Sequence, residues 1–264
     1  MKGNRVILAA HRGEKKYHPE NTMPAFQAAL EAGVDMIETD IHQTCDGELI
    51  IMHDRSALRT AGVDRFITDM SLAEVRQLDA GGWMAAEFAG TGVLTVREFM
   101  EWICPTDLLI NWELKDYPHE VGDVIAFSSA DKLVELIEEY GLQHRSMVNS
   151  FSNRVLEHIV ENHGHRFPVH GQGILNARRT KDEATIAEEN LFDWCCLYPN
   201  EMGHSPVEYP ENFAHCVENG ILPCVCIPDR EDTYAKAVAY GCKMFTSNDI
   251  YAAEEVLRKI GVRK

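Results

Sequence analysis

The sequence predicts an α/β protein that folds as a (β/α)8 TIM barrel with a small insertion after the second strand. Strand-like and helix-like runs alternate along the whole chain, which is typical of the βα units that build a parallel sheet. Eight strand-like runs are present, and the length of 264 residues is close to the roughly 250 residues of such barrels. We therefore expect residues 1–264 to form one domain around one core.

The predicted strands are short runs rich in β-branched, aromatic and other apolar residues. In chain order they cover residues 6–11, 36–41, 108–115, 146–151, 167–174, 194–199, 222–227 and 243–248. Helix-like runs cover residues 22–32, 95–103, 129–140, 153–163, 181–190, 206–219, 231–240 and 250–260. Several open at a residue that can cap the first turn, namely Thr22, Thr95, Ser152 and Asp249. Glycines suited to left-handed positions precede the next strand at Gly33, Gly141, Gly220 and Gly241.

One long segment interrupts this alternation after the second strand. The chain passes through Asp46-Gly47, a hairpin-turn signal, into a further apolar run and then into a polar, glycine-rich stretch. We assign residues 54–94 to an insertion within the barrel domain, because the stretch is too long for an ordinary βα loop. Loops that follow barrel strands build the active site, so this insertion should overhang the mouth and contact a bound ligand.

The charge balance bears on the partners of the chain. The formal net charge of −17 disfavours nucleic acid, whose binding requires a basic surface, and it also disfavours stable association with an anionic membrane. No apolar run approaches the ~18 residues of a membrane span. The apolar stretch before His11 is too short for the core of a signal peptide. These features predict a cytoplasmic protein.

The eight cysteines are expected to be reduced and buried, as is usual for an intracellular chain of this size. Cys195, Cys196, Cys224 and Cys226 lie in apolar strand-like runs, where we interpret them as small core residues. A zinc site is not expected there, because the CxxC or HxxxH partners of such a site are missing.

Carboxylates on two predicted strands indicate a metal site. Glu38 and Asp40 are two residues apart in one strand, so their side chains point to the same face. Glu113 shares a face with Lys115 in the next strand. In one parallel barrel the three acids would form a pocket whose oxygen ligands suit Mg²⁺, Ca²⁺ or Mn²⁺. The alternative is a metal-free cluster neutralised by Arg12 and Lys115, which would leave one buried carboxylate unpaired.

Two histidines are candidates for proton transfer. His11 and His53 each follow an apolar strand run, so each should emerge at the rim of the barrel. An imidazole with a near-neutral pKa can accept or donate a proton at working pH. The alternative for each is a hydrogen-bonded core histidine, which is our interpretation of the other histidines, including His18 and His42.

Short motifs around these residues follow a fixed order. They are HRG (11–13), PENT (19–22), IETD (37–40), TCDG (44–47), MHD (52–54) and WELK (112–115). In these motifs the chain resembles the glycerophosphodiester phosphodiesterase family, closely in the first half and by overall plan in the second. The resemblance implies metal-dependent hydrolysis of glycerophosphodiesters, which are deacylated phospholipids, to a glycerol phosphate and an alcohol. The implied partner is therefore a small-molecule phosphodiester.

The resemblance also implies roles for the site residues. His11 and His53 would be the catalytic acid and base, although their order, and the choice between water and the substrate's 2-hydroxyl as attacking group, stay open. One divalent cation, Mg²⁺ or Ca²⁺ with Mn²⁺ as a further candidate, would bind to the three carboxylates. Arg12 and Lys115 would bind substrate, because their cationic groups match phosphate oxygens. Glu20 would either contact a substrate hydroxyl or orient the residues that bind the substrate and the metal.

Two strand ends depart from the family pattern. The seventh strand runs into CVCIPD (224–229), where the family has a tryptophan-containing motif. The eighth runs into TSND (246–249), where an ITD-like ending is usual. Asn149, Gln172 and Asn200 lie at other strand ends and are candidates for the missing contacts. These departures leave the pocket for the leaving group undetermined.

Two other functions stay open. A lysophospholipase D acting on lipid substrates would be favoured by an exposed apolar face on the insertion, where Phe66, Trp83 and Phe88 are the large candidates. A non-catalytic barrel that binds phosphodiesters would be favoured by the loss of a motif residue. The core motif residues are all present.

Overall fold

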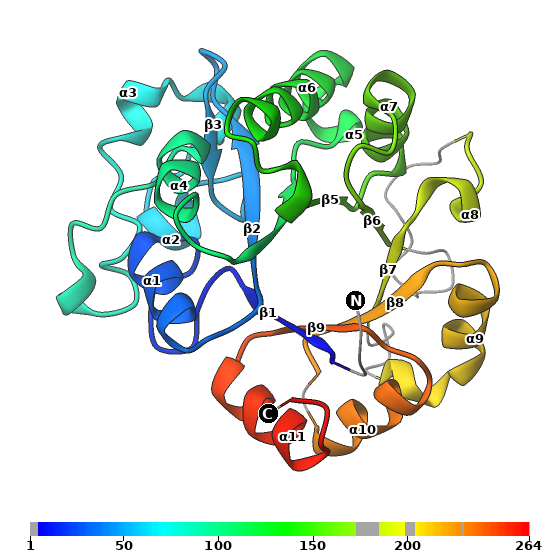
Figure 1. The fold of residues 1–264 in the computed structure, drawn as a ribbon. Helices are drawn as coiled ribbons and strands as arrows, with labels where there is room; N and C mark the ends of the chain where they lie inside the picture. Colours follow the sequence, from blue (N-terminus) through cyan, green and yellow to red (C-terminus); the bar gives the residue numbers. More distant parts are fainter. Residues whose placement is uncertain (1–4, 173–184, 199–203, 229, 264) are drawn as a thin grey trace.

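The computed structural model describes residues 5–172, 185–198, 204–228 and 230–263. In these residues one sheet contains β1 (Ile7–His11), β2 (Met36–Gln43), β3 (Leu49–Ile51), β4 (Leu109–Leu114), β5 (Ser146–Ser150), β6 (Val169–Gly171), β7 (Trp194–Leu197), β8 (Leu222–Cys226) and β9 (Met244–Ser247). All except β3 are parallel and follow the order β1-β9-β8-β7-β6-β5-β4-β2, and pairing of β2 with β1 closes the ring (Figure 1). The predicted (β/α)8 barrel is confirmed.

Helices surround this barrel on its outside (Figure 1). Those outside the insertion are α1 (Met23–Glu31), α4 (Val96–Ile103), α5 (Pro118–Val121), α6 (Asp123–Glu139), α7 (Asn153–His163), α8 (Glu188–Leu191), α9 (Pro210–Glu218), α10 (Glu231–Ala239) and α11 (Ile250–Lys259). They pack on outward-facing strand residues. The ring of Phe99, for example, lies 4.7 Å from that of Phe26 and 5.4 Å from that of Trp112. Among the described residues, no helix is long and apolar enough to cross a membrane.

The predicted helix ends agree with the structure at most positions. Thr95, Ser152 and Asp249 each cap a helix through the side chain, and the four predicted glycines have positive φ between 67° and 96°. Thr22 occupies the cap position of α1, but its hydroxyl donates to the Pro19 carbonyl instead. Helix α6 begins at Asp123 rather than at residue 129, so the expected start is six residues late. Residues 173–174 and 181–184 lie outside the described residues.

Strand residues alternate between the outer core and the barrel interior. The interior contains an apolar layer made of Ile7, Ala9, Met36, Met147, Trp194, Cys196, Cys224, Cys226 and Met244. Nearer the carboxyl ends of the strands, polar side chains replace it. His11 ends β1, Glu38 and Asp40 lie on β2, and Glu113 lies on β4. The polar groups therefore gather at the end of the barrel where enzymes of this architecture place their active sites.

The segment between β3 and α4 has a small core of its own. It contains α2 (Leu58–Ala61), η1 (Ile67–Asp69), α3 (Leu72–Val75) and η2 (Ala86–Phe88). Its buried apolar residues pack on β3, which pairs antiparallel with β2 after the predicted Asp46-Gly47 turn. The amide of Ile51 donates to the carbonyl of Leu94 over 2.9 Å, so the segment leaves and rejoins the barrel beside β3.

The cysteines differ from the expectation in two ways. Cys196 on β7 and Cys226 on β8 form a disulfide, with their Cα atoms 6.3 Å apart, so the expectation of reduced cysteines is wrong for this pair. The sequence could not show that both side chains point into the barrel from neighbouring strands. Cys45 and Cys104 are exposed rather than buried, while Cys195, Cys216, Cys224 and Cys242 are buried and outside any disulfide.

Candidate active site

Three carboxylates meet at the mouth of the barrel. Glu38 and Asp40 share the inner face of β2, and the strand register places Asp40 directly beside Glu113 on β4. One oxygen from each of the three groups lies within 4.8 Å of the others, and all three side chains are buried. The alternation of β2 and β4 therefore produces the predicted pocket, and its role in metal binding remains a prediction.

Cations and an amide surround Asp40. Arg12 Nε and Lys115 Nζ each lie 3.2 Å from its carboxylate oxygens, and Asn21 Nδ2 donates to Oδ2 over 2.7 Å. Burial alone would raise the pKa of Asp40, but the charges of Lys115 and Arg12 hold that pKa well below its usual range. Asp40 is therefore ionised at any working pH. Asn21 belongs to the PENT motif, but no local sequence pattern distinguishes its amide from that of any other asparagine.

Glu38 and Glu113 are the two acids of the pocket whose pKa values are raised. Burial and the neighbouring acids Asp40 and Glu113 raise the pKa of Glu38 well above its usual value. Burial also raises the pKa of Glu113, with Lys115 opposing the shift. Within the described residues, the buried Oε1 of Glu38 has no hydrogen-bond donor. An orphaned oxygen in an acidic, all-oxygen pocket fits a hard divalent cation.

The backbone of the HRG motif supports Glu38. The amide of Arg12 donates to Glu38 Oε2 over 2.9 Å, and this orientation requires a left-handed backbone at Arg12, with φ of 62°. Gly13 follows with φ of 81°, and a Cβ there would lie 2.8 Å from the carbonyl carbon of Ala25. A glycine is thus needed for the turn that aims the Arg12 amide at the carboxylate.

His11 is held as a neutral imidazole at the end of β1. Its Nδ1 donates to Oδ1 of Asn248 over 2.5 Å, and its Nε2 lies 3.9 Å from Glu38 Oε2. Burial, with the charges of Arg12 and Lys15, lowers the pKa of His11 to about 3. Asn248 belongs to the TSND segment that departs from the family pattern. Its contact with His11 joins residues 237 positions apart, which no local sequence pattern indicates.

His53 lies two residues beyond β3 and has a carboxylate partner. Its Nδ1 donates to Asp54 Oδ1 over 2.5 Å. Burial and the charge of Lys115 lower its pKa to about 4. Asp54 in turn accepts from Arg59 Nε over 2.6 Å. The negative charge of Asp40 opposes the lowering of the pKa of both His53 and His11, so both imidazoles lie within electrostatic reach of the carboxylate pocket.

Lys115 completes the pocket at the end of β4. Its Nζ forms an ion pair with Glu113 and lies 5.4 Å from the ring centre of Phe151. Asn149 Nδ2 donates to Glu113 Oε2, and Gln172 Nε2 donates to Asn149 Oδ1, each over 3.3 Å. Two of the predicted strand-end amides therefore support Glu113. Asn200 and Asp229 lie outside the described residues.

Glu20 connects the barrel to the insertion. Its Oε1 accepts from Arg12 Nη1 over 2.9 Å and from Arg59 Nη2 over 2.6 Å. Burial opposes ionisation, but the hydrogen bond from Arg59 and the charges of Arg12 and Lys15 lower the pKa of Glu20 to about 2. Arg59 lies on α2, so the insertion reaches the site through this side chain. Arg59 was not predicted, because its neighbours in sequence give no functional signal.

This network predicts a specific acid sensitivity. A carboxylate whose folded pKa lies below its ordinary 4.5 contributes stability that is present above that value and lost as the pH falls toward 2. We expect the free energy of unfolding to fall by roughly 1–3 kcal/mol between pH 5 and pH 2 through Glu20 alone. Denaturant unfolding of the parent and of Glu20→Gln would measure this. Equal pH slopes for the two proteins would refute the assignment.

His42 agrees with its interpretation as a core histidine. It is buried, and its Nδ1 lies 2.7 Å from Asp116 Oδ1. Its Nε2 lies 3.3 Å from the carbonyl oxygen of His53. His18 instead contacts Glu14 Oε2 at 2.7 Å and faces the ring of Phe88. Both histidines thus pair with carboxylates outside the pocket of Glu38, Asp40 and Glu113, and His18 is partly exposed rather than a core residue.

A family model connects this geometry to known proteins. The model of the glycerophosphoryl diester phosphodiesterase family matches residues 11–194, which is more than half of the chain. The chain belongs to this family. All the carboxylates, both histidines and both bases of the site fall within the matched residues, so the glycerophosphoryl diester phosphodiesterase match covers the site except for Asn248.

Individual relatives agree with the family match. A glycerophosphodiester phosphodiesterase from Caldanaerobacter subterraneus subsp. tengcongensis is 37% identical over 155 residues, which are 59% of this chain and 62% of that protein. The alignment thus spans less than two thirds of that relative.

Solved structures show the same fold. The glycerophosphodiester phosphodiesterase from Agrobacterium tumefaciens superposes with a TM-score of 0.75 at 21% identity, covering 94% of this chain and 99% of that one. An Oleispira antarctica phosphodiesterase in complex with the product sn-glycerol-3-phosphate gives a TM-score of 0.79 at 20% identity, covering 96% of both chains. These neighbours extend the likeness of fold over nearly the whole chain, beyond the aligned segment of the curated relative.

Proposed function

We propose that this protein hydrolyses glycerophosphodiesters to a glycerol phosphate and an alcohol, with one divalent cation as cofactor. The observation that carries the proposal is the pocket of Glu38, Asp40 and Glu113 at the mouth of a barrel of this family, where the charge of Asp40 also acts on His11 and His53. The donor set fits Mg²⁺, Ca²⁺ or Mn²⁺, because it contains only oxygen and, within the described residues, leaves Glu38 Oε1 and Asp40 Oδ1 buried without a hydrogen-bond donor. When bound, such a cation would polarise a phosphoryl oxygen and acidify a bound water or hydroxyl.

The basic residues would bind the phosphate group. Arg12 and Lys115 form ion pairs with different carboxylate oxygens of Asp40, so their side chains are oriented before substrate binds. A phosphodiester carries one negative charge, which the two cations would share with the bound metal. Glu20 Oε1 accepts a hydrogen bond from Arg12 Nη1 over 2.9 Å. This contact favours a role for Glu20 in orienting Arg12 over direct contact with a substrate hydroxyl.

The hydrogen bonds of the two histidines differ, and this difference suggests their roles. The Nδ1–H of His53 is paired with the carboxylate of Asp54, which would stabilise an imidazolium. The Nδ1–H of His11 is paired with the neutral amide of Asn248. We assign His11 as the group that accepts a proton through Nε2 from the attacking hydroxyl. His53, in the imidazolium form that the Asp54 carboxylate would stabilise, then donates its Nε2 proton to the departing alcohol and returns to the neutral form.

The substrate is proposed to be a small molecule. The net charge of −17 disfavours nucleic acid, and a cytoplasmic location remains part of the proposal.

The preference for a head group depends on the side chains around the mouth. Strand β8, the seventh parallel strand of the barrel, contains cysteines where an aromatic residue would be needed to bind a quaternary ammonium group. Leu58, Phe66 and Trp83 of the insertion are exposed, which keeps a lipid substrate as a second candidate. Trp83 donates its indole N–H to the Ala80 carbonyl, within the insertion itself.

A comparison of four substrates tests this proposal. We expect kcat/KM for glycerophosphocholine, glycerophosphoethanolamine and glycerophosphoglycerol to agree within tenfold, a gap of under ~1.4 kcal/mol. Lysophosphatidylcholine should be the poorest of the four. A preference for the lysolipid would favour the lysophospholipase D alternative, and a choline preference beyond a hundredfold that Trp83→Ala abolishes would make the insertion a recognition lid. Absence of turnover with all four would favour the non-catalytic alternative.

A further inference from the structure

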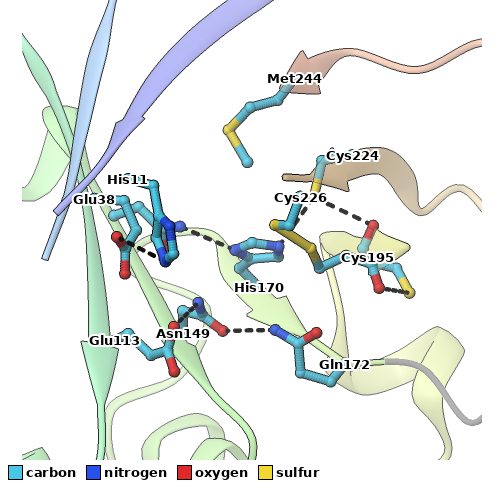
Figure 2. The surroundings of a disulfide bond; sticks show 12 residues. His11, Glu38, Glu113, Asn149, His170, Gln172, Cys195, Cys224, Cys226 and Met244 are labelled. Atoms are coloured by element: carbon cyan, nitrogen blue, oxygen red, sulfur yellow. Dashed lines mark hydrogen bonds and ion pairs between the residues drawn. A yellow bond between two sulfur atoms is a disulfide. The ribbon is translucent and has the colours of Figure 1, made fainter. Parts of the chain in front are cut away.

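A second group of ligand-type side chains lies inside the barrel, apart from the carboxylate pocket. His170 on β6, Cys196 on β7 and Cys224 on β8 place one ligand atom each within 4.8 Å of the others. All three are fully buried. Figure 2 shows His170 directed at the cysteine side chains, which lie across the interior from Glu38 and Glu113. The proposed hydrolysis does not use any of them.

The strand register explains why these residues meet. Cys196 lies directly beside Cys224, since β7 and β8 are parallel neighbours in this register. Cys226 follows Cys224 by two residues, so it shares the inner face, and it forms the disulfide with Cys196. His170 enters from β6, the other neighbour of β7. Three sulfur atoms and one imidazole therefore converge from three adjacent strands.

The hydrogen bonds around His170 prepare it as a ligand. Its Nε2 lies 3.0 Å from Cys224 Sγ, and its Nδ1 lies 3.2 Å from Asn111 Nδ2. Within the described residues, Oδ1 of Asn111 is buried without a hydrogen-bond partner. Rotation of this amide would let Oδ1 accept the Nδ1–H, leaving the Nε2 lone pair directed at the sulfurs. Histidine ligands of metals usually donate their second N–H in this way.

We propose that, after reduction of the Cys196–Cys226 disulfide, His170, Cys196, Cys224 and Cys226 bind one thiophilic cation of the zinc type. Three cysteines and one histidine are a common ligand set for tetrahedral zinc, and soft sulfur ligands exclude the hard cations that suit the carboxylate pocket. The expectation from the sequence that no zinc site is present rests only on the missing CxxC and HxxxH spacings. The ligands in fact come from three strands that are far apart in the chain.

The chemistry of loading is a simple exchange. A dithiol reductant becomes its own disulfide and passes two electrons and two protons to the Cys196–Cys226 bond, which yields two thiols. The cation then displaces protons from the cysteine thiols, and these protons leave to solvent.

Cobalt(II) titration of the full chain tests this site. The protein is reduced with a dithiol, freed of reductant without oxygen, and given excess Mg²⁺ to occupy the carboxylate pocket. We expect one equivalent of Co²⁺ to produce thiolate-to-cobalt charge-transfer absorption, and Zn²⁺ to remove it by displacement. The protein with its disulfide intact should show none. Absence of this absorption in the reduced protein would overturn the proposal.

Matched cysteine variants locate the ligands. Cys224→Ser should weaken Co²⁺ binding by more than about tenfold and reduce the charge-transfer intensity. Cys242→Ser is the control, because Cys242 is equally buried but packs in the outer core. If Cys224→Ser behaves like the control, the site is wrong. If Cys224→Ser does not fold, X-ray absorption of the reduced parent loaded with Zn²⁺ decides, since we expect three sulfur neighbours and a shell of only nitrogen and oxygen would contradict the site.

Discussion

Exchange of His11 or His53 for alanine is expected to lower kcat toward glycerophosphodiesters by about 10²- to 10⁴-fold while the protein stays folded. A positioned group that transfers a proton contributes a factor of this size. Neither imidazole carries the structure, because each lies at a strand end or loop at the rim. The matched control is His144→Ala, which removes an exposed histidine remote from the carboxylates in sequence. Rates should be compared with circular dichroism and melting curves of each variant.

Substrates with different leaving groups distinguish the proposed role of His11 as base from that of His53 as acid. A substrate with an activated leaving group such as p-nitrophenol needs no proton donor, so it should restore most of the turnover of His53→Ala. The same substrate should not rescue His11→Ala, because the attacking group still requires a base. Rescue of His11→Ala instead would exchange the two assignments. Near-parental kcat for either variant on the natural substrates would show that this histidine is a core residue.

Exchange of Asp40 for asparagine is the second large effect that we expect. Asp40 accepts contacts from Arg12, Lys115 and Asn21, and its pKa is the lowest of the three acids for that reason. The amide keeps the shape but removes a charge that would bind the cation. We expect turnover to fall by at least about 10²-fold and the concentration of Mn²⁺ that gives half-maximal rate to rise.

A paired control makes this experiment specific. Glu113→Gln should act in the same direction as Asp40→Asn, whereas Glu135→Gln changes an exposed acid on α6 and should leave both quantities unchanged. Melting curves are needed, because either change also leaves Lys115 with one charge partner fewer. Parental activity in Asp40→Asn would favour the interpretation of the carboxylates as a metal-free cluster.

The sequence predicted the parts of the site that depend on local patterns. The alternation of Glu38 and Asp40 in one strand fixes a shared face, and closure of a parallel barrel brings Glu113 beside them. The apolar runs that end at His11 and His53 predict both histidines at the rim of the barrel. These inferences needed only the strand period and the parallel order of the strands.

Contacts between distant segments could not be predicted in the same way. Asn248 reaches His11 across 237 positions of the chain, and Arg59 reaches Glu20 from the insertion. The disulfide and the His170 cluster depend on which strand residues face inward at the same height, which is a property of the barrel register. Spacing motifs such as CxxC describe ligands within one local segment, so they fail for ligands spread over three strands.

The most direct test of the central claim is the release of glycerol phosphate from glycerophosphoethanolamine before and after removal of divalent cations. The purified protein is dialysed against a chelator, then into metal-free buffer, and Mg²⁺, Ca²⁺ or Mn²⁺ is returned one at a time. The three converging carboxylates predict no turnover after chelation and recovery with at least one of these cations. Full turnover in the chelated protein would contradict the metal site, and no turnover with any of the three cations would contradict the proposed activity.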